Sequence, residues 1–137
     1  MSERIPIVVR AMLLCERVKV RHGIHTLVNP LTSIVMPSGV KNKLQLDALF
    51  VYTQLVGGLG RCNLSVQVRA FDSGYVFGRS QMEAVDFPSQ ERDLVIERVF
   101  VLRRLVFQRP GLYEFQVFAN YLELDRGAVY LSVFPGD

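Results

Sequence analysis

The chain has only two histidines, His22 and His25, and their spacing would serve metal binding if both lay on one face. Residues three apart share a helix face, but on a strand they point to opposite sides. A hairpin turn would bring them together, and the third ligand would then have to come from Cys15, Glu16 or a distant carboxylate. We therefore interpret both histidines as turn residues and predict neither a metal site nor a bound cofactor.

Nucleophilic catalysis would need an activated serine or cysteine, and no pattern in the chain supplies one. The chain has no Gly-x-Ser-x-Gly elbow, and Cys15 and Cys62 both lie in strand-like patterns, where buried, reduced thiols are expected. Residues 57–60, Gly-Gly-Leu-Gly, lack the following lysine and the helix start of a phosphate-binding loop. The sequence predicts no catalytic residue. The alternative is an enzyme whose site is assembled from loops without a sequence motif.

Three cationic residues, Arg17, Lys19 and Arg21, alternate with Val18 and Val20. Because side chains of a strand alternate between its two faces, the three charges are expected on one face. Such a row can bind a phosphate backbone or an acidic protein surface. Lysines and arginines also protect exposed strands from pairing edge to edge, which is the simpler interpretation. The three cations are our candidate contact site for a polyanion or a protein partner.

The composition indicates one globular domain, which we place at residues 1–137. The 20 Val and 5 Ile favour strands over helices. Residues 1–69 carry nine Lys and Arg against three Asp and Glu, whereas residues 70–137 carry seven against ten. Arg10, Lys41 and Lys43 belong to the basic half and would extend the cationic face. Nucleic-acid modules usually show a denser basic stripe interleaved with aromatic residues, so nucleic acid is the weaker prediction for the partner.

The clearest strand follows a Pro-Gly turn: Tyr113, Phe115 and Val117 alternate with Glu114 and Gln116. This period of two predicts one apolar face against a core and one face in water. A second strand with the same pattern has Leu64, Val66 and Val68 as its apolar set, and we expect it beside or opposite the first. A tyrosine just after such a turn, at the start of the penultimate strand, also resembles the tyrosine corner of immunoglobulin-like domains.

Further extended segments are separated by turn signals such as His22-Gly23, Asp72-Ser73-Gly74 and Asn120-Tyr121. They cover residues 5–21, 24–36, 44–54, 62–71, 75–79, 82–87, 94–107 and 129–133. We predict an all-β fold, an immunoglobulin-like antiparallel β-sandwich of seven to nine strands, with a closed β-barrel as the alternative.

Two stretches of the chain together match a known pattern. They are Leu13-Leu14-Cys15-Glu16, followed by a hairpin through His22-Gly23 and Thr26-Leu27-Val28, and the later Pro110-Gly111-Leu112-Tyr113-Glu114-Phe115. This order resembles a family of small uncharacterised bacterial proteins classified only as a domain of unknown function. Leu-Leu-Cys-Asp is common there, and Glu16 stands where Asp is usual. The resemblance implies a single-domain bacterial sandwich and carries no activity or site residue.

Several apolar residues are expected to point outward, which predicts self-association. They are Leu49, Leu55, Val56, Leu59 and Phe118. Because sandwiches have open edges and two-fold dimers are the commonest soluble assembly, we predict a homodimer.

The sequence does not specify a biological role, and the function we predict is accordingly general. We predict a non-catalytic binding or assembly module of a bacterial cytoplasmic system. Its partner is expected to be itself or another protein, with nucleic acid as the alternative and no membrane, since no uncharged apolar run reaches transmembrane length.

Overall fold

The computed structural model describes residues 7–37, 43–87 and 94–136, without the side chains of Asp125 and Arg126. These residues form ten strands and no helix. The strands are β1 (Val8–Arg21), β2 (Ile24–Leu31), β3 (Ser33–Val35), β4 (Leu44–Val56), β5 (Gly60–Ala70), β6 (Val76–Arg79), β7 (Glu83–Phe87), β8 (Ile96–Phe107), β9 (Gly111–Ala119) and β10 (Leu122–Phe134).

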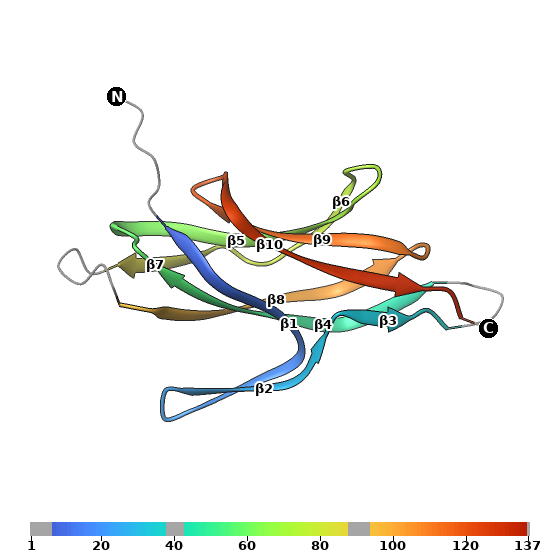
Figure 1. Ribbon diagram of the computed structural model, residues 1–137, viewed down its shortest axis with the longest axis horizontal. Coiled ribbons are helices and arrows are strands. Elements are labelled where there is room, and N and C mark those ends of the chain that lie inside the picture. The colour runs from blue at the N-terminus through green and yellow to red at the C-terminus, as the bar shows by residue number, and fades with distance from the viewer. Residues whose placement is uncertain (1–6, 38–42, 88–93, 137) are drawn as a thin grey trace.

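The strands build two sheets that pack face to face (Figure 1). Sheet A has the order β2-β1-β4-β8, and sheet B has the order β3-β10-β9-β5-β6, with β7 also paired to β5. All pairs are antiparallel except β10 with β3. The predicted β-sandwich is confirmed, and the described strands form two separate sheets rather than the alternative barrel. The described residues form ten strands, one more than the upper limit of the prediction, because the extended segment at residues 24–36 divides at Thr32 into β2 and β3.

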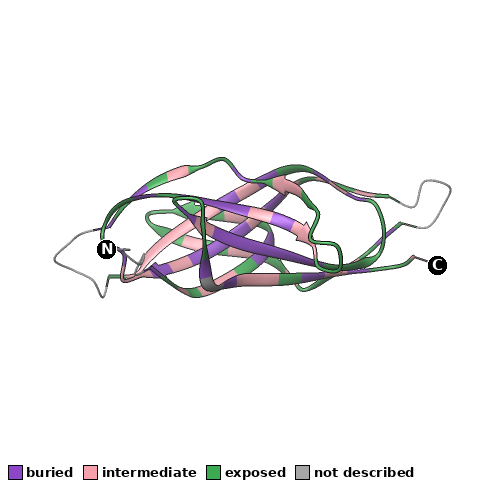
Figure 2. Ribbon diagram, turned by 90° about the horizontal axis from the view of Figure 1, so that it is seen from above, coloured by how far each residue is buried: buried purple, intermediate pink, exposed green. Residues whose placement is uncertain are grey.

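The predicted core of β5 and β9 is confirmed. Val66 lies opposite Val117 and Val68 lies opposite Phe115, and all four side chains are fully buried. Because directly opposed residues of an antiparallel pair share a face, the apolar sets of both strands line the same interior. Buried residues occur on the strands of both sheets (purple in Figure 2), and their side chains form one continuous cluster.

Tyr113 forms the hydrogen bond of a tyrosine corner. Its hydroxyl donates to the backbone carbonyl of Arg109 at 2.5 Å, four residues upstream, as the sequence pattern indicated. The ring contacts Phe107 and Phe77 edge to face, with ring centroids 4.8 Å and 5.4 Å away. This contact fixes the start of β9 to both β8 and β6.

The prediction that Leu49 and Leu55 face outward is wrong, because both side chains are buried. That prediction assumes one unbroken alternation along β4, with Leu44 and Leu46 facing the core. In the structure those two leucines pack against the core, and the buried set then shifts by one residue, from Leu46 to Leu49. Alternation along β4 is therefore interrupted once, and the remaining strand has the opposite phase.

The neighbouring strand β8 shows the same shift at the same place. Leu102 and Leu105 are both buried although they are three residues apart, and Arg104 between them has a left-handed backbone with φ of 55°. The register stays constant, since Leu46 pairs with Leu105 and Leu49 with Leu102. The two strands thus exchange faces together, and the exchange leaves Arg103 and Arg104 exposed.

Candidate functional site

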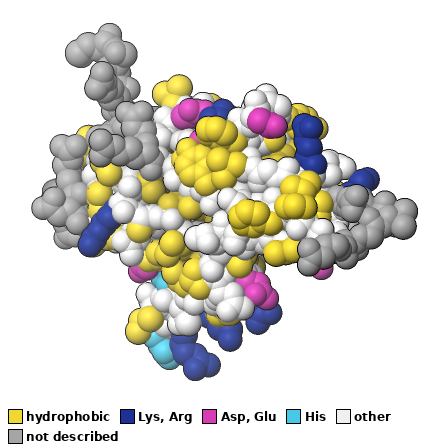
Figure 3. Space-filling view, turned by 45° about the vertical axis from the view of Figure 1, so that its right-hand side comes forward, with side chains coloured by type: hydrophobic (Ala, Val, Ile, Leu, Met, Phe, Trp, Pro, Cys, Tyr) yellow, Lys and Arg dark blue, Asp and Glu magenta, His cyan; other side chains and the backbone are white. Residues whose placement is uncertain are grey.

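The three predicted cations lie on a hairpin that extends away from the sandwich; we call residues 16–29 the arm. Arg17, Lys19 and Arg21 are all exposed, and their cross-strand partners place them on one face of the arm. In Figure 3, Lys, Arg and His side chains gather on the lobe that projects below the body. The predicted common face is confirmed. Lys41, which was expected to extend it, lies outside the described residues.

The arm separates from sheet A at Cys15. The pairing of β1 with β4 ends at Cys15 opposite Phe50, whereas the pairing of β1 with β2 continues to Arg21 and Ile24. At its base, Asn29 has a left-handed backbone with φ of 51°, and its side-chain amide donates to Glu16 at 2.7 Å. The remaining arm is a two-stranded ribbon whose backbone bonds join only its own strands in the described structure.

His25 connects the opposite face of the arm to the outer surface of sheet A. Its ring lies 5.7 Å from that of Tyr52 on β4, and its Nδ1 lies 3.4 Å from a carboxylate oxygen of Glu97 on β8. The Tyr52 hydroxyl donates to Glu97 and accepts from the Gln54 amide at 2.8 Å. His25 is thus a packed contact residue. Within the described residues, no three His, Cys, Asp or Glu side chains are placed to hold a metal ion.

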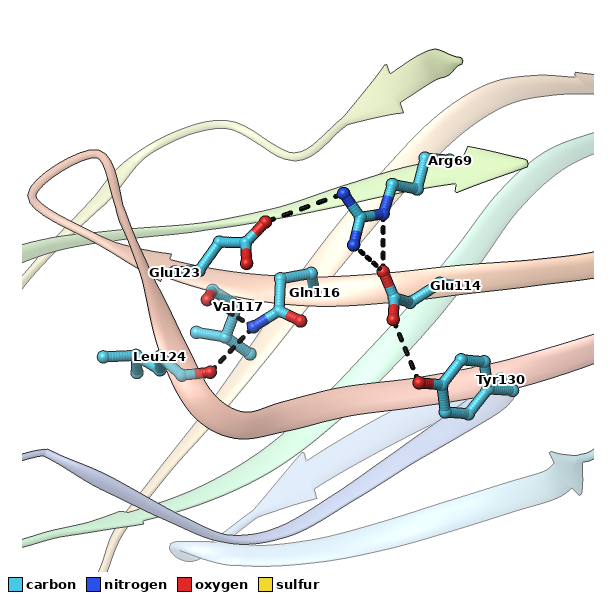
Figure 4. A network of polar contacts seen from close by, with 7 residues as sticks. All are labelled: Arg69, Glu114, Gln116, Val117, Glu123, Leu124 and Tyr130. Atoms are coloured by element: carbon cyan, nitrogen blue, oxygen red, sulfur yellow. Dashed lines mark hydrogen bonds and ion pairs between the residues drawn. The ribbon is translucent and has the colours of Figure 1, made fainter. Parts of the chain in front are cut away.

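The outer face of β9 carries a polar network, and the prediction that this face lies in water is wrong. Glu114 and Gln116 are buried, at 6% and 7% exposure. Arg69 on β5 donates to Glu114 at 2.5 Å, and the Tyr130 hydroxyl on β10 donates to the same carboxylate at 3.0 Å (Figure 4). The Gln116 amide donates to the carbonyl of Leu124 at 2.9 Å. Groups on the flanking strands β5 and β10 therefore cover these two side chains.

Two hollows lie on either side of the connection from β6 to β7. One, of about 220 Å³, opens on the outer face of sheet B and is lined by Ser65, Gln67, Arg79, Ser80, Met82, Phe118 and Tyr121. The other, of about 480 Å³, lies between this connection and β8 and is lined by Arg79, Ser80, Gln81, Glu83, Phe100, Val101 and Arg103. The sequence did not predict either hollow. Its only signal was the Arg-Arg pair that interrupts the apolar run at residues 94–107.

Cys15 and Cys62 are free and buried, as predicted. Burial raises the pKa of both thiols, which lowers their thiolate fraction at neutral pH. Since the thiolate is the nucleophile, neither cysteine has the environment of a reactive one.

Comparison with known proteins adds no family: no protein-family model matches the chain, and no curated protein matches it in sequence. Among the described residues, no helix is long and apolar enough to span a membrane.

The raised pKa values of three tyrosine hydroxyls lead us to expect a loss of stability at alkaline pH. Burial raises the pKa of Tyr52 and Tyr113, and a hydrogen bond to Glu114 raises that of Tyr130. Because each folded-state pKa lies above the unfolded value of about 10, this stabilisation is complete below that pH and is lost as pH rises through the folded-state values. The urea midpoint should therefore fall between about pH 9 and about pH 11.

Tyr113→Phe provides the control for that titration. It removes one of the three raised hydroxyls, so the midpoint of this variant should fall less steeply with pH than that of the parent protein. Equal slopes in the two proteins would exclude Tyr113 as a source of the effect.

Proposed function

We propose that the protein is a non-catalytic binding or assembly module that contacts its partner through the arm. The observation that carries this proposal is the separation of the arm from sheet A after Cys15. Val20 and Ile24 near its tip are 59% and 69% exposed. Exposed apolar side chains on a projecting ribbon suit a protein interface, where they become buried on association.

The partner is a second copy of the chain or another protein. The cations on one face of the arm favour an acidic surface, and residues 70–137 of the chain itself carry more Asp and Glu than Lys and Arg. The open edge of β8, which pairs only with β4 among the described strands, offers a further place for association. These features support a homodimer, and we place the module in the bacterial cytoplasm, where two reduced cysteines are usual.

Light scattering of the purified protein at micromolar concentration tests self-association. We expect a mass about twice the 15.6 kDa of one chain. Val20→Ser combined with Ile24→Ser should shift the protein toward monomer, because it removes the apolar tip. Tyr75→Ser is the matched control, since Tyr75 is 66% exposed at the distant turn between β5 and β6. A single species of 15.6 kDa for the parent protein would contradict the homodimer.

A polyanion is the second candidate partner, and the common face of Arg17, Lys19 and Arg21 is the observation that favours it. Fluorescence anisotropy with labelled DNA distinguishes a nucleic-acid partner from a protein partner. Binding that weakens steeply with salt and is lost in a variant with all three cations changed to Gln would support nucleic acid. No binding at low salt would leave the protein partner as the proposal.

A further inference from the structure

The larger of the two hollows lies where the edges of both sheets meet. Arg79 at the end of β6 belongs to sheet B, and Arg103 on β8 belongs to sheet A, yet both line the same space of about 480 Å³. That volume lies within the usual range for sites that bind small molecules. Phe100 and Val101 add apolar wall, and Ser80, Gln81 and Glu83 supply further polar groups.

The two arginines are available for a ligand. Both are exposed, and within the described residues neither forms an ion pair, in contrast to Arg69, which pairs with Glu114 and Glu123. A guanidinium presents several N–H donors in a planar arrangement that matches carboxylate and phosphate oxygens. Two such groups lining one hollow would suit an anion with more than one charged oxygen.

The backbone on the sheet B side of the hollow is held firmly. Ser80 is buried, its N–H donates to the carbonyl of Val66 at 2.8 Å, and its hydroxyl accepts from the N–H of Val66 at 2.9 Å. The same hydroxyl donates to the carbonyl of Gln81 at 3.1 Å. These bonds fix the connection that carries Arg79 on one side and Glu83 on the other.

The sheet A side contains the left-handed Arg104. A left-handed backbone at a residue other than Gly costs on the order of 1–3 kcal/mol, and such residues concentrate at functional sites. It changes the phase of β8 directly after Arg103, which follows the buried Leu102 and lies exposed beside the hollow. The arginine is thus placed on a paired strand and not on a loop.

Among the described residues, Glu83 is the one carboxyl group that lines the hollow, and it opposes an anion when it is charged. Burial raises its pKa, while Arg98 acts in the opposite direction. A protonated Glu83 would donate a hydrogen bond to a bound anion, whereas an ionised one would repel it. Anion affinity is therefore expected to increase as the pH falls toward the range in which Glu83 binds its proton.

We propose that this hollow binds a small organic anion with several carboxylate or phosphate oxygens, held by Arg79 and Arg103. The site is separate from the arm, and its occupancy does not depend on the partner proposed above. Carboxylate and phosphate ligands share this chemistry, and the choice of probe distinguishes them.

Titration of isotope-labelled protein with citrate and, separately, with inorganic phosphate at constant ionic strength tests the proposal by NMR. We expect saturable shifts at the amides of residues 79–83 and at the side-chain N–H groups of Arg79 and Arg103. Preference for one probe identifies the oxygen chemistry. Shifts with neither probe, or shifts that increase linearly with concentration, would overturn the proposal.

Single substitutions test whether the anion binds in this hollow. Arg79→Gln and Arg103→Gln should each weaken binding at least about tenfold, the loss typical of one charge-assisted contact. Arg109→Gln, at an exposed arginine in the turn between β8 and β9 that lines neither hollow, is the matched control and should leave the affinity unchanged. Glu83→Gln should strengthen binding several-fold at pH 8, because it removes the repelling charge. Equal affinity in the Arg109 and Arg79 variants, or weaker binding in the Glu83 variant, would exclude this hollow as the site.

Discussion

Phe115→Ala is expected to lower the free energy of unfolding by about 3–5 kcal/mol, the usual cost of removing a fully buried phenylalanine side chain. Phe115 is at the centre of β9, with Val68 of β5 on one side and Val129 of β10 on the other. Its side chain is 0% exposed. Because β9 is a central strand of sheet B, the surrounding side chains have little freedom to fill the cavity.

Urea unfolding followed by circular dichroism measures this loss. Phe134→Ala is the matched control, since Phe134 is 52% exposed near the end of β10 and should cost less than about 1 kcal/mol. A similarly small loss for Phe115→Ala would mean that β9 presents the opposite face to the core.

Simple alternation predicted β5 and β9 correctly because both strands keep one phase across their core positions. It failed on β4, which exchanges faces together with β8 near Arg104. Arginine is not a residue type that marks a positive φ, so nothing in the sequence signals that exchange. The exchange keeps both strands in register only because they change faces together, with Leu46 opposite Leu105 and Leu49 opposite Leu102.

The same limit explains the outer face of β9. Alternation identifies which residues share a face, but not what covers that face. Glu114 and Gln116 are covered by contacts with Arg69, Tyr130 and Leu124, which come from β5 and β10. A polar strand face therefore predicts exposure only where groups of the flanking strands do not cover it.

The candidate sites show a corresponding contrast. The three cations of the arm are local in sequence, so their common face followed from spacing alone. The separation of the arm from the sheet could not be predicted from spacing, because it depends on where the pairing of β1 with β4 ends. Arg79 and Arg103 belong to different sheets, and only the packing of β6 against β8 brings them to one hollow.

Gly78 permits that packing, and Gly78→Ala is expected to destabilise the protein by about 1–3 kcal/mol, as overpacking of a well-filled core does. A Cβ at this position would overlap Cδ2 of Leu105 on β8 and lie 2.9 Å from Cγ1 of Val68 on β5. Leu105 and Val68 are both buried, so neither side chain has open space to move into.

A double-mutant cycle with Leu105→Val tests this cause. Valine lacks the δ carbon that the new methyl group would overlap, so the double variant should be more stable than the sum of the single losses predicts, by about 1 kcal/mol. Additive losses would show that Leu105 is not the obstacle. Citrate titration of Gly78→Ala extends the test, because a β6 displaced from β8 would move Arg79 away from Arg103, and binding should weaken even though both arginines remain.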